Sequence, residues 1–317
     1  MSITFRSGFK ARINIRDFYS ITQVIPDYES SPFIINERYE DFLERRLLSS
    51  KIQKGKYAAD FGGGYGRLMD ILLNNFDHVF LVDYSARNLL NAKKKFGSDR
   101  VTYIVSDIRK QILLNNSIDL GICIRVFHHY PRIPFIDSMT SSLVQHGKFI
   151  FNFNNVESPL FLLSLTRGFL KRDRNILNPL RKETQKIQVE SGTRDIYFTP
   201  LASIVNSIPE NMDIKEVEGF GLFHNSGFEK LSVKFDLAKI TDFELSLGKI
   251  DFLSRLLPDI FIFLEKNGYE KIADIKKLTG IIIFSRCKGL LKYNGWNYKC
   301  ESCGASFPTS DGIIDLR

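Results

Sequence analysis

The sequence lacks long hydrophobic runs and an N-terminal secretion signal. A membrane-spanning helix needs about 20 consecutive apolar residues, whereas the apolar runs at 159–165 and 256–264 are much shorter. The opening segment mixes charged and apolar side chains, and a secretory signal would place one continuous apolar block after its positive end. We therefore expect a cytoplasmic protein with no transmembrane segment.

Cysteine is also scarce, with four residues in a chain of 317. Three of them lie near the end of the chain, a spacing that suits a metal site better than a disulfide framework. A hydrophobic content of 44% excludes a disordered or fibrous chain. The net charge of +8 is compatible with nucleic acid, phosphorylated substrates or an anionic membrane surface, and charge alone does not choose among them.

Short apolar runs alternate with helix-period segments between residues 56 and 155. The expected strands span 57–61, 78–82, 101–105, 120–126 and 148–153, and the expected helices span 67–75, 86–96 and 135–144. This alternation predicts an α/β fold in which helices cover both faces of a parallel sheet. Right-handed crossovers then place a ligand crevice at the carboxyl ends of the strands.

The segments around this core divide the rest of the chain. Residues 1–55 are expected to form an N-terminal cap that includes a helix at 37–48. Residues 156–198 are a basic insertion suited to act as a lid, with cations at Arg167, Lys171, Arg172, Arg174, Arg181, Lys182 and Lys186. A helix at 201–206, a strand at 214–223, a helical insertion at 228–277 and a last strand at 280–285 complete a domain at 56–285. Residues 286–317 form a small tail.

A glycine-rich loop follows the first expected strand and precedes a helix. It starts at Asp60 and continues through Gly62, Gly64 and Gly66. Glycines let the backbone turn sharply and approach a ligand, and the following helix offers free N–H groups at its start. A dinucleotide motif needs a third glycine where this chain has Arg67 in one register and Met69 in the other. The spacing therefore disfavours a nicotinamide cofactor.

Acidic residues also end the next two expected strands. Asp83 lies about twenty residues after the glycines, where an acid can accept hydrogen bonds from both hydroxyls of a ribose. Asp107 closes the third strand, where it can accept from an adenine amine beside the backbone of Ile108. Three acids at the ends of three successive strands indicate a nucleoside site.

The segments DFGGGYG, VDYS, SDI and IDLGICIRVFHHY resemble the successive motifs of class I S-adenosylmethionine (SAM) dependent methyltransferases. The resemblance covers roughly residues 35–225 and 275–285. It implies a Rossmann-like, doubly wound sheet of seven strands with the seventh antiparallel, for which we nominate 214–223 as strand six and 280–285 as strand seven. The helical insertion between them departs from the simplest family pattern.

The same resemblance assigns roles to the motif residues. Asp60 is expected near the methionine amino group, the three glycines along the methionine and ribose, Asp83 at the ribose, and Asp107 with Ile108 at the adenine. The complete set expected to bind SAM is Asp60, Gly62, Gly64, Gly66, Asp83, Tyr84, Asp107, Ile108 and Arg125.

Methyl transfer from a sulfonium mainly requires alignment of a nucleophile and exclusion of water. A base is needed only for acceptors that must lose a proton. His128 and His129 follow the fourth strand and are candidate catalytic bases, with a structural hydrogen bond as the alternative. Arg125 suits an acidic substrate or a cap on the sheet edge. Tyr28, Tyr65 and Tyr130 are candidate pocket aromatics, with plain packing as the alternative.

The tail resembles a small zinc ribbon because Cys300 and Cys303 form a Cys-x-x-Cys knuckle. Similar ribbons occur in the activator subunit of tRNA and rRNA methyltransferases. An intact ribbon would add a second knuckle to complete four thiolates, but Phe284 stands where a partner of Cys287 is expected. Either the ribbon is metal-free or a fourth ligand comes from elsewhere. The sequence favours the metal-free ribbon and makes Cys287, Cys300 and Cys303 weak candidate ligands.

The sequence therefore predicts a SAM-dependent methyltransferase acting on a small-molecule or lipid-like acceptor. One alternative is an RNA methyltransferase, which the net charge, the basic insertion and the ribbon favour. Another is a catalytically silent SAM-binding scaffold whose tail docks a protein partner. Labelling by SAM of small molecules, of RNA, or of neither distinguishes the three.

Overall fold

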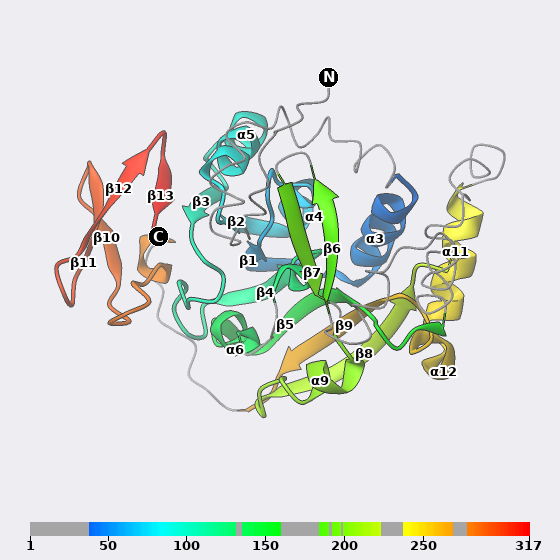
Figure 1. Ribbon diagram of the computed structural model, residues 1–317. Helices are drawn as coiled ribbons and strands as arrows, with labels where there is room; N and C mark the ends of the chain where they lie inside the picture. Colours follow the sequence, from blue (N-terminus) through cyan, green and yellow to red (C-terminus); the bar gives the residue numbers. More distant parts are fainter. Residues whose placement is uncertain are drawn as a thin grey trace, which may run out of the picture.

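Parallel strands form the centre of the computed structural model (Figure 1). They are β1 (Gly55–Phe61), β2 (Phe76–Asp83), β3 (Val101–Val105), β4 (Ile118–Cys123) and β5 (Leu143–Asn154). The structure describes residues 38–130, 135–159, 184–189, 192–197, 199–222, 237–268 and 278–317. All five strands were predicted, because each is an apolar run buried on both faces. Their order in the sheet is β3-β2-β1-β4-β5, so the chain reverses its direction of winding next to β1.

Helices cover both faces of this sheet, as doubly wound topology requires. One face packs against α3 (Arg38–Lys51), α4 (Met69–Asn75), α5 (Ala86–Phe96) and α11 (Leu237–Gly248). The other face packs against α6 (Ile136–Thr140) and α9 (Leu201–Val205). Successive side chains of one strand point to opposite faces; Ala58 belongs to the first core and Ala59 to the second.

The reversed strand of the sheet is β9 (Asp259–Lys266), which runs antiparallel to β5 and also pairs antiparallel with β8 (Met212–Phe220). The prediction that residues 280–285 form strand seven was therefore wrong. Within 228–277, the described residues contain α11 and α12 (Asp251–Ser254), but 259–266 is a strand rather than part of a helical insertion. Residues 278–281 form a 3-10 turn (Leu278–Ile281). The antiparallel direction of strand seven was predicted correctly, and only its position was not.

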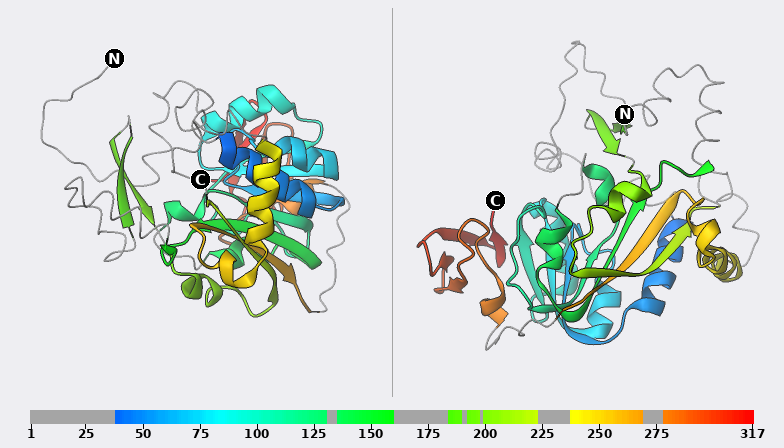
Figure 2. Two further views of the ribbon diagram at one scale, coloured as in Figure 1. Left: turned by 90° about the vertical axis from the view of Figure 1, so that its right-hand side faces the viewer. Right: turned by 90° about the horizontal axis from the view of Figure 1, so that it is seen from below.

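The tail continues the same sheet rather than forming a separate body. Strands β10 (Leu291–Tyr293), β11 (Asn297–Cys300), β12 (Ser306–Ser310) and β13 (Ile313–Asp315) extend it beyond β3, giving eleven strands in all. Strand β13 runs parallel to β3, and the Leu316 N–H donates to the Val105 carbonyl at 2.8 Å. The tail thus covers the β3 edge, which would otherwise present unpaired backbone groups. Figure 2 shows it at the opposite end of the sheet from α11 and α12.

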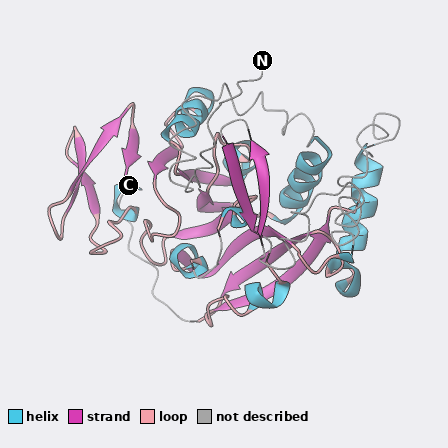
Figure 3. Cartoon of the chain, in the orientation of Figure 1, coloured by secondary structure: helices cyan, strands magenta, loops and turns pink. Residues whose placement is uncertain are grey.

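The predicted lid and cap are described only in part by the structure. The predicted lid at 156–198 contains a hairpin of β6 (Thr184–Val189) and β7 (Gly192–Tyr197), which forms a two-stranded sheet of its own. Figure 3 shows these two strands in front of the large sheet. Residues 160–183, the part of the cap before residue 38, and Tyr28 lie outside the described residues. No helix in the described ranges combines the length and hydrophobicity of a membrane span.

Candidate cofactor site

The glycine loop forms a tight turn at the carboxyl end of β1. Gly62, Gly64 and Gly66 all have positive φ angles, at 81°, 57° and 81°. A Cβ added at Gly62 would lie 2.6 Å from Val126 Cγ2, so this position tolerates only glycine. Among the described residues, a Cβ at Gly64 would meet nothing closer than Asn88 Nδ2 at 3.8 Å. Gly64 is thus required by its left-handed backbone conformation, and its Cα faces open space in which a ligand can lie.

Asp83 ties the glycine loop to the start of α5. Its Oδ2 accepts from the Gly64 N–H at 2.9 Å, and its Oδ1 accepts from the Ser85 N–H at 2.8 Å. Ser85 in turn caps α5, because its hydroxyl accepts from the Asn88 N–H. Burial raises the pKa of Asp83 to about 6, and the two backbone hydrogen bonds oppose that rise.

Asp60 lies beside Asp83 and is almost completely buried, with 2% exposure. Its carboxyl accepts no hydrogen bond from any residue in the described part of the chain. Burial raises its pKa to about 7, the Arg67 charge lowers it, and the Asp83 charge raises it. A cation brought next to this carboxyl would favour its ionised form.

Gly63 was not among the predicted site residues, but the Asp60 carboxyl occupies the space that a side chain at Gly63 would fill. A Cβ at Gly63 would lie 2.4 Å from Asp60 Oδ2, so any larger residue would displace the carboxyl. The run of three consecutive glycines was the available signal.

Asp107 lies at the end of β3, next to the end of β2, and its carboxylate is paired with Arg109. Arg109 Nη2 lies 2.6 Å from Asp107 Oδ2, and the Arg109 N–H also donates to Oδ1 at 3.0 Å. Burial alone would raise the pKa of Asp107, but the bonds and charge of Arg109 lower it. Ile108 is 3% exposed and belongs to the core. The structure thus brings all three strand-end acids to one edge of the sheet.

Comparison with known proteins agrees with this geometry. Residues 59–151 match a protein family described as a methyltransferase domain. Below, "methyltransferase domain" refers to this matched segment. It contains the glycine loop and the three acids described above. No protein of curated function matches the sequence significantly.

Two solved structures show the fold that surrounds the methyltransferase domain. A putative S-adenosylmethionine dependent methyltransferase from Listeria monocytogenes is similar over 73% of this chain and 99% of its own, with a TM-score of 0.51 and 15% identity. The PH0226 protein from Pyrococcus horikoshii OT3 is similar over 78% and 99%, with a TM-score of 0.52 and 17% identity. The predicted Rossmann-like fold is therefore confirmed.

Arg125 connects the methyltransferase domain to α3. It has a φ of 60°, and its N–H donates to Asn152 Oδ1 at 2.6 Å. Its Nε lies 2.9 Å from both carboxylate oxygens of Glu44, which is 0% exposed. Arg67 Nη2 approaches the same carboxylate at 2.8 Å. Arg125 was predicted to bind SAM, to bind an acidic substrate or to cap the sheet edge, and these contacts favour the last, structural role.

A further buried carboxyl, which was not predicted, lies where β9 begins, beside the carboxyl end of β5. Asp259 begins β9, is 5% exposed, and accepts from Asn154 Nδ2 at 2.6 Å. Burial raises its pKa well above the ordinary range, and the charges of Glu40 and Glu44 raise it further. A signal was present, since an acid opens the apolar run at 259–264, but that run had been assigned to a helix.

The two histidines lie in a 3-10 turn, Phe127–His129, directly after β4. Their ring centroids are 3.9 Å apart and the rings meet edge to face. His129 is 9% exposed, and its N–H donates to the Val126 carbonyl. The turn fixes both rings near the carboxyl end of β4, and their catalytic role stays a prediction.

Two tyrosines lie around the adenine end of the expected site. Tyr84 follows Asp83, and the Arg317 guanidinium lies 5.7 Å from its ring centroid. The Arg109 guanidinium lies 5.6 Å from the ring centroid of Tyr130. The tail therefore contributes a cation directly beside the expected cofactor residues, which the sequence did not predict. Tyr65, the remaining candidate aromatic, is buried at 8% exposure.

Cys287, Cys300 and Cys303 lie together in the tail, with their sulfur atoms within 4.8 Å of one another. The Cys287 Sγ is 3.3 Å from Cys300 Sγ and 3.5 Å from Cys303 Sγ. Sulfurs around a tetrahedral zinc lie about 3.8 Å apart, given bonds of about 2.3 Å. Burial alone would raise the pKa of Cys300, but backbone N–H groups of residues 302 and 303 lower it. These positions fit a soft metal held by three thiolates and a fourth external ligand.

We expect the protein purified without added metal to contain about one zinc per chain, although the sequence favoured a metal-free ribbon. Elemental analysis measures the zinc, and thiol titration before and after chelation measures the protected cysteines. A Cys303→Ser variant should lose the metal. A Phe284→Cys variant supplies a thiolate at the position of the missing ligand and should hold zinc longer against a chelator. Metal-free protein with three freely reactive thiols would contradict the expectation.

Proposed function

We propose that this chain is a SAM-dependent methyltransferase that acts on a small-molecule or lipid-like acceptor. The observation that carries the proposal is that the buried Asp60 carboxyl, which accepts no hydrogen bond from the described residues, lies beside a glycine loop that Asp83 holds in place. A carboxyl in that state favours a neighbouring cation, and the methionine part of SAM ends in an ammonium group. The match of residues 59–151 to a methyltransferase domain agrees with this proposal.

The residues present fit the cofactor along its whole length. Asp60 would hold the ammonium, the backbone from Gly62 to Gly64 would lie along the methionine and ribose, and Asp83 would accept from the ribose hydroxyls. Asp107 and Ile108 would hold the adenine, with Tyr84 beside it. When bound, SAM supplies a methyl group made electrophilic by its sulfonium.

The remaining task of the chain is to align an acceptor with that methyl group and exclude water. His128 or His129 would take a proton if the acceptor carries one, and an ionised acceptor needs no base. The similarity of the fold to that of a putative SAM-dependent methyltransferase from Listeria monocytogenes is consistent with methyl transfer.

The proposal is tested by incubation with methyl-labelled SAM and fractionated cell extract, alongside calorimetry of SAM binding. Label in small molecules or lipids supports the proposed acceptor class. Label in RNA supports the alternative RNA methyltransferase, while SAM binding with no label in any fraction supports a silent scaffold. Failure of SAM to bind at millimolar concentration would overturn the proposal.

A further inference from the structure

A cavity of about 990 Å³ lies between the tail and the segment that follows β3. One wall comes from residues 109–111, Tyr130 and the region of α6, and the other comes from residues 284–288, 305–307 and the last two residues. The two walls meet because β13 pairs with β3. The cavity therefore exists only in the docked arrangement of tail and methyltransferase domain.

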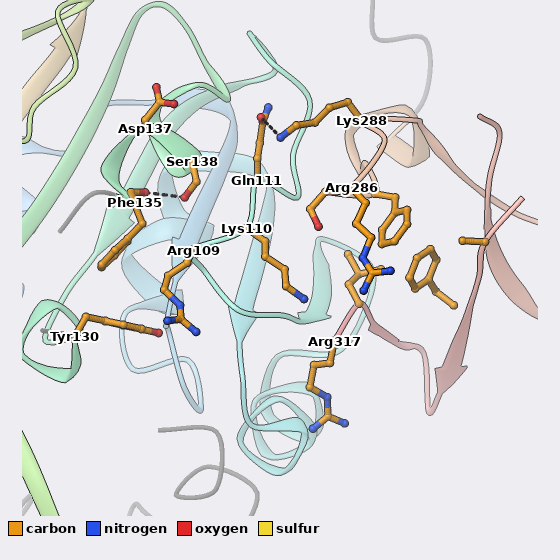
Figure 4. Close-up of a pocket in the computed structure, with 15 residues that line it drawn as sticks. Arg109, Lys110, Gln111, Tyr130, Phe135, Asp137, Ser138, Arg286, Lys288 and Arg317 are labelled. Atoms are coloured by element: carbon orange, nitrogen blue, oxygen red, sulfur yellow. Dashed lines mark hydrogen bonds between the residues drawn. The ribbon is translucent and has the colours of Figure 1, made fainter. Parts of the chain in front are cut away.

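The lining of this cavity is strongly basic. It contains five cations and one carboxylate, Asp137. The five cations are Arg109, Lys110, Arg286, Lys288 and Arg317. Figure 4 shows the Lys110 ammonium and the Arg286 guanidinium pointing into the space between the two walls. Like charges gathered around one cavity repel one another, and an anion between them removes that repulsion.

Most of these charges are not neutralised within the described ranges. Arg109 and Arg317 are paired with Asp107 and Asp315. Lys288 donates to the neutral amide oxygen of Gln111 at 2.6 Å. Lys110 and Arg286 form no ion pair with any described residue. Three cations therefore face a single lining carboxylate.

Flat apolar side chains lie among the cations. Phe284 and Phe307 are in contact on the tail side, with ring centroids 4.8 Å apart. Tyr130 and Phe135 are in contact on the opposite side at the same separation. Aromatic side chains in the wall of a cavity can stack on the planar rings of a ligand, and arginine and lysine side chains bind phosphate groups. A cavity of this volume is also in the range of sites for small organic ligands.

We propose that this cavity binds a phosphate-bearing organic molecule beside the adenine end of the expected cofactor site; its position relative to the cofactor rests on the proposed function. Arg109 joins the cavity to the cofactor residues because it pairs with Asp107 and lies against Tyr130. Arg317 does the same from the tail because it lies against Tyr84. A ligand anchored by Lys110 and Arg286 would thus lie next to the adenine end of the cofactor.

The test measures binding of inorganic pyrophosphate by calorimetry, with S-adenosylhomocysteine present at saturation to fill the nucleoside site. The full-length protein should bind pyrophosphate, and the Lys110→Ala/Arg286→Ala double variant should bind it at least about tenfold more weakly, since charge-assisted contacts are lost. Lys292→Ala is the matched control, because Lys292 lies on the same tail, pairs with Glu301 and does not line the cavity. This control should bind pyrophosphate like the unchanged protein.

The source of the phosphate is then identified with uridine monophosphate, glycerol 3-phosphate and vesicles of phosphatidylglycerol. Tightest binding of the first supports a nucleotide-like ligand, and tightest binding of either of the others supports a lipid precursor or headgroup. Absence of pyrophosphate binding, or equal loss in the control variant, overturns the proposal. So does binding of long RNA without any binding of pyrophosphate, since that indicates diffuse attraction. Because this readout needs no methyl transfer, it stays separate from failure of the proposed function.

Discussion

Replacing Asp83 by alanine is expected to weaken SAM binding by about tenfold to a hundredfold. The Asp83 carboxylate would accept from the ribose hydroxyls, and a hydrogen bond to a charged group contributes roughly 1.5–3 kcal/mol. The same carboxylate holds the Gly64 N–H at 2.9 Å, so its loss also loosens the glycine loop. Calorimetric titration with SAM measures the change in affinity.

The pH dependence of SAM binding provides a second readout for Asp83. Burial raises its pKa to about 6, so the carboxyl becomes protonated as the pH falls below that value and accepts hydrogen bonds poorly. Affinity of the unchanged protein should therefore decrease from pH 7.5 toward pH 5.5, because Asp60, with a pKa of about 7, and Asp83 both become protonated. Asp83→Ala should keep only the part of this dependence that comes from Asp60 and respond less steeply. Asp77→Ala is the control, because Asp77 is exposed near the other end of β2. Equal affinity of the two variants would remove Asp83 from the site.

Local patterns in the sequence predicted the central fold well. Helix α5 was predicted at its observed bounds, because Ser85 caps its start and Gly97, with a φ of 72°, ends it. Strand β9 was missed because a short apolar run, here residues 260–264, fits a buried helix or a buried strand equally well. Its antiparallel partners β5 and β8 are distant in the sequence, and no local signal indicates that pairing.

The docking of the tail could not be predicted for the same reason. Strand β13 has three residues and pairs with β3 about two hundred positions earlier in the chain. The tail was expected to be a separate ribbon, and the pairing instead makes it one wall of a cavity next to the cofactor residues. Long-range pairing thus created the cavity that we propose binds a phosphate-bearing molecule.

In the candidate site too, residues marked by a local sequence pattern were predicted and residues placed by long-range contacts were not. Asp60, Asp83 and Asp107 were predicted because each ends a strand, and parallel strands bring their carboxyl ends to one edge. Glu44 was not predicted, because it lies in a charge-rich helix typical of a solvated surface. Its burial depends on two arginines, Arg67 and Arg125, that are brought to it only by the completed fold.

Replacing Glu44 by alanine is expected to lower the free energy of unfolding by about 3–5 kcal/mol, because it leaves two largely buried guanidinium groups without their shared partner. Burial alone would raise the pKa of Glu44, but the charges of Arg125 and Arg67 hold it below its usual value of 4.5. The stabilisation is therefore present above about pH 4.5 and is lost as the pH falls through the lowered pKa. Urea denaturation at pH 7 and at acidic pH measures both effects.

Asp70→Ala is the matched control for this prediction, because Asp70 pairs with Arg45 on the surface and its side chain is 52% exposed. An exposed pair contributes about 0–1 kcal/mol, so the control should change stability little. Glu44→Gln keeps a side chain of similar shape but removes its charge, and it should fall between the two. If Glu44→Ala unfolds at the same urea concentration as Asp70→Ala, the Glu44 carboxylate does not hold α3 against the methyltransferase domain, and the remaining contacts of Arg125, which include Glu40 and Asn152, are sufficient.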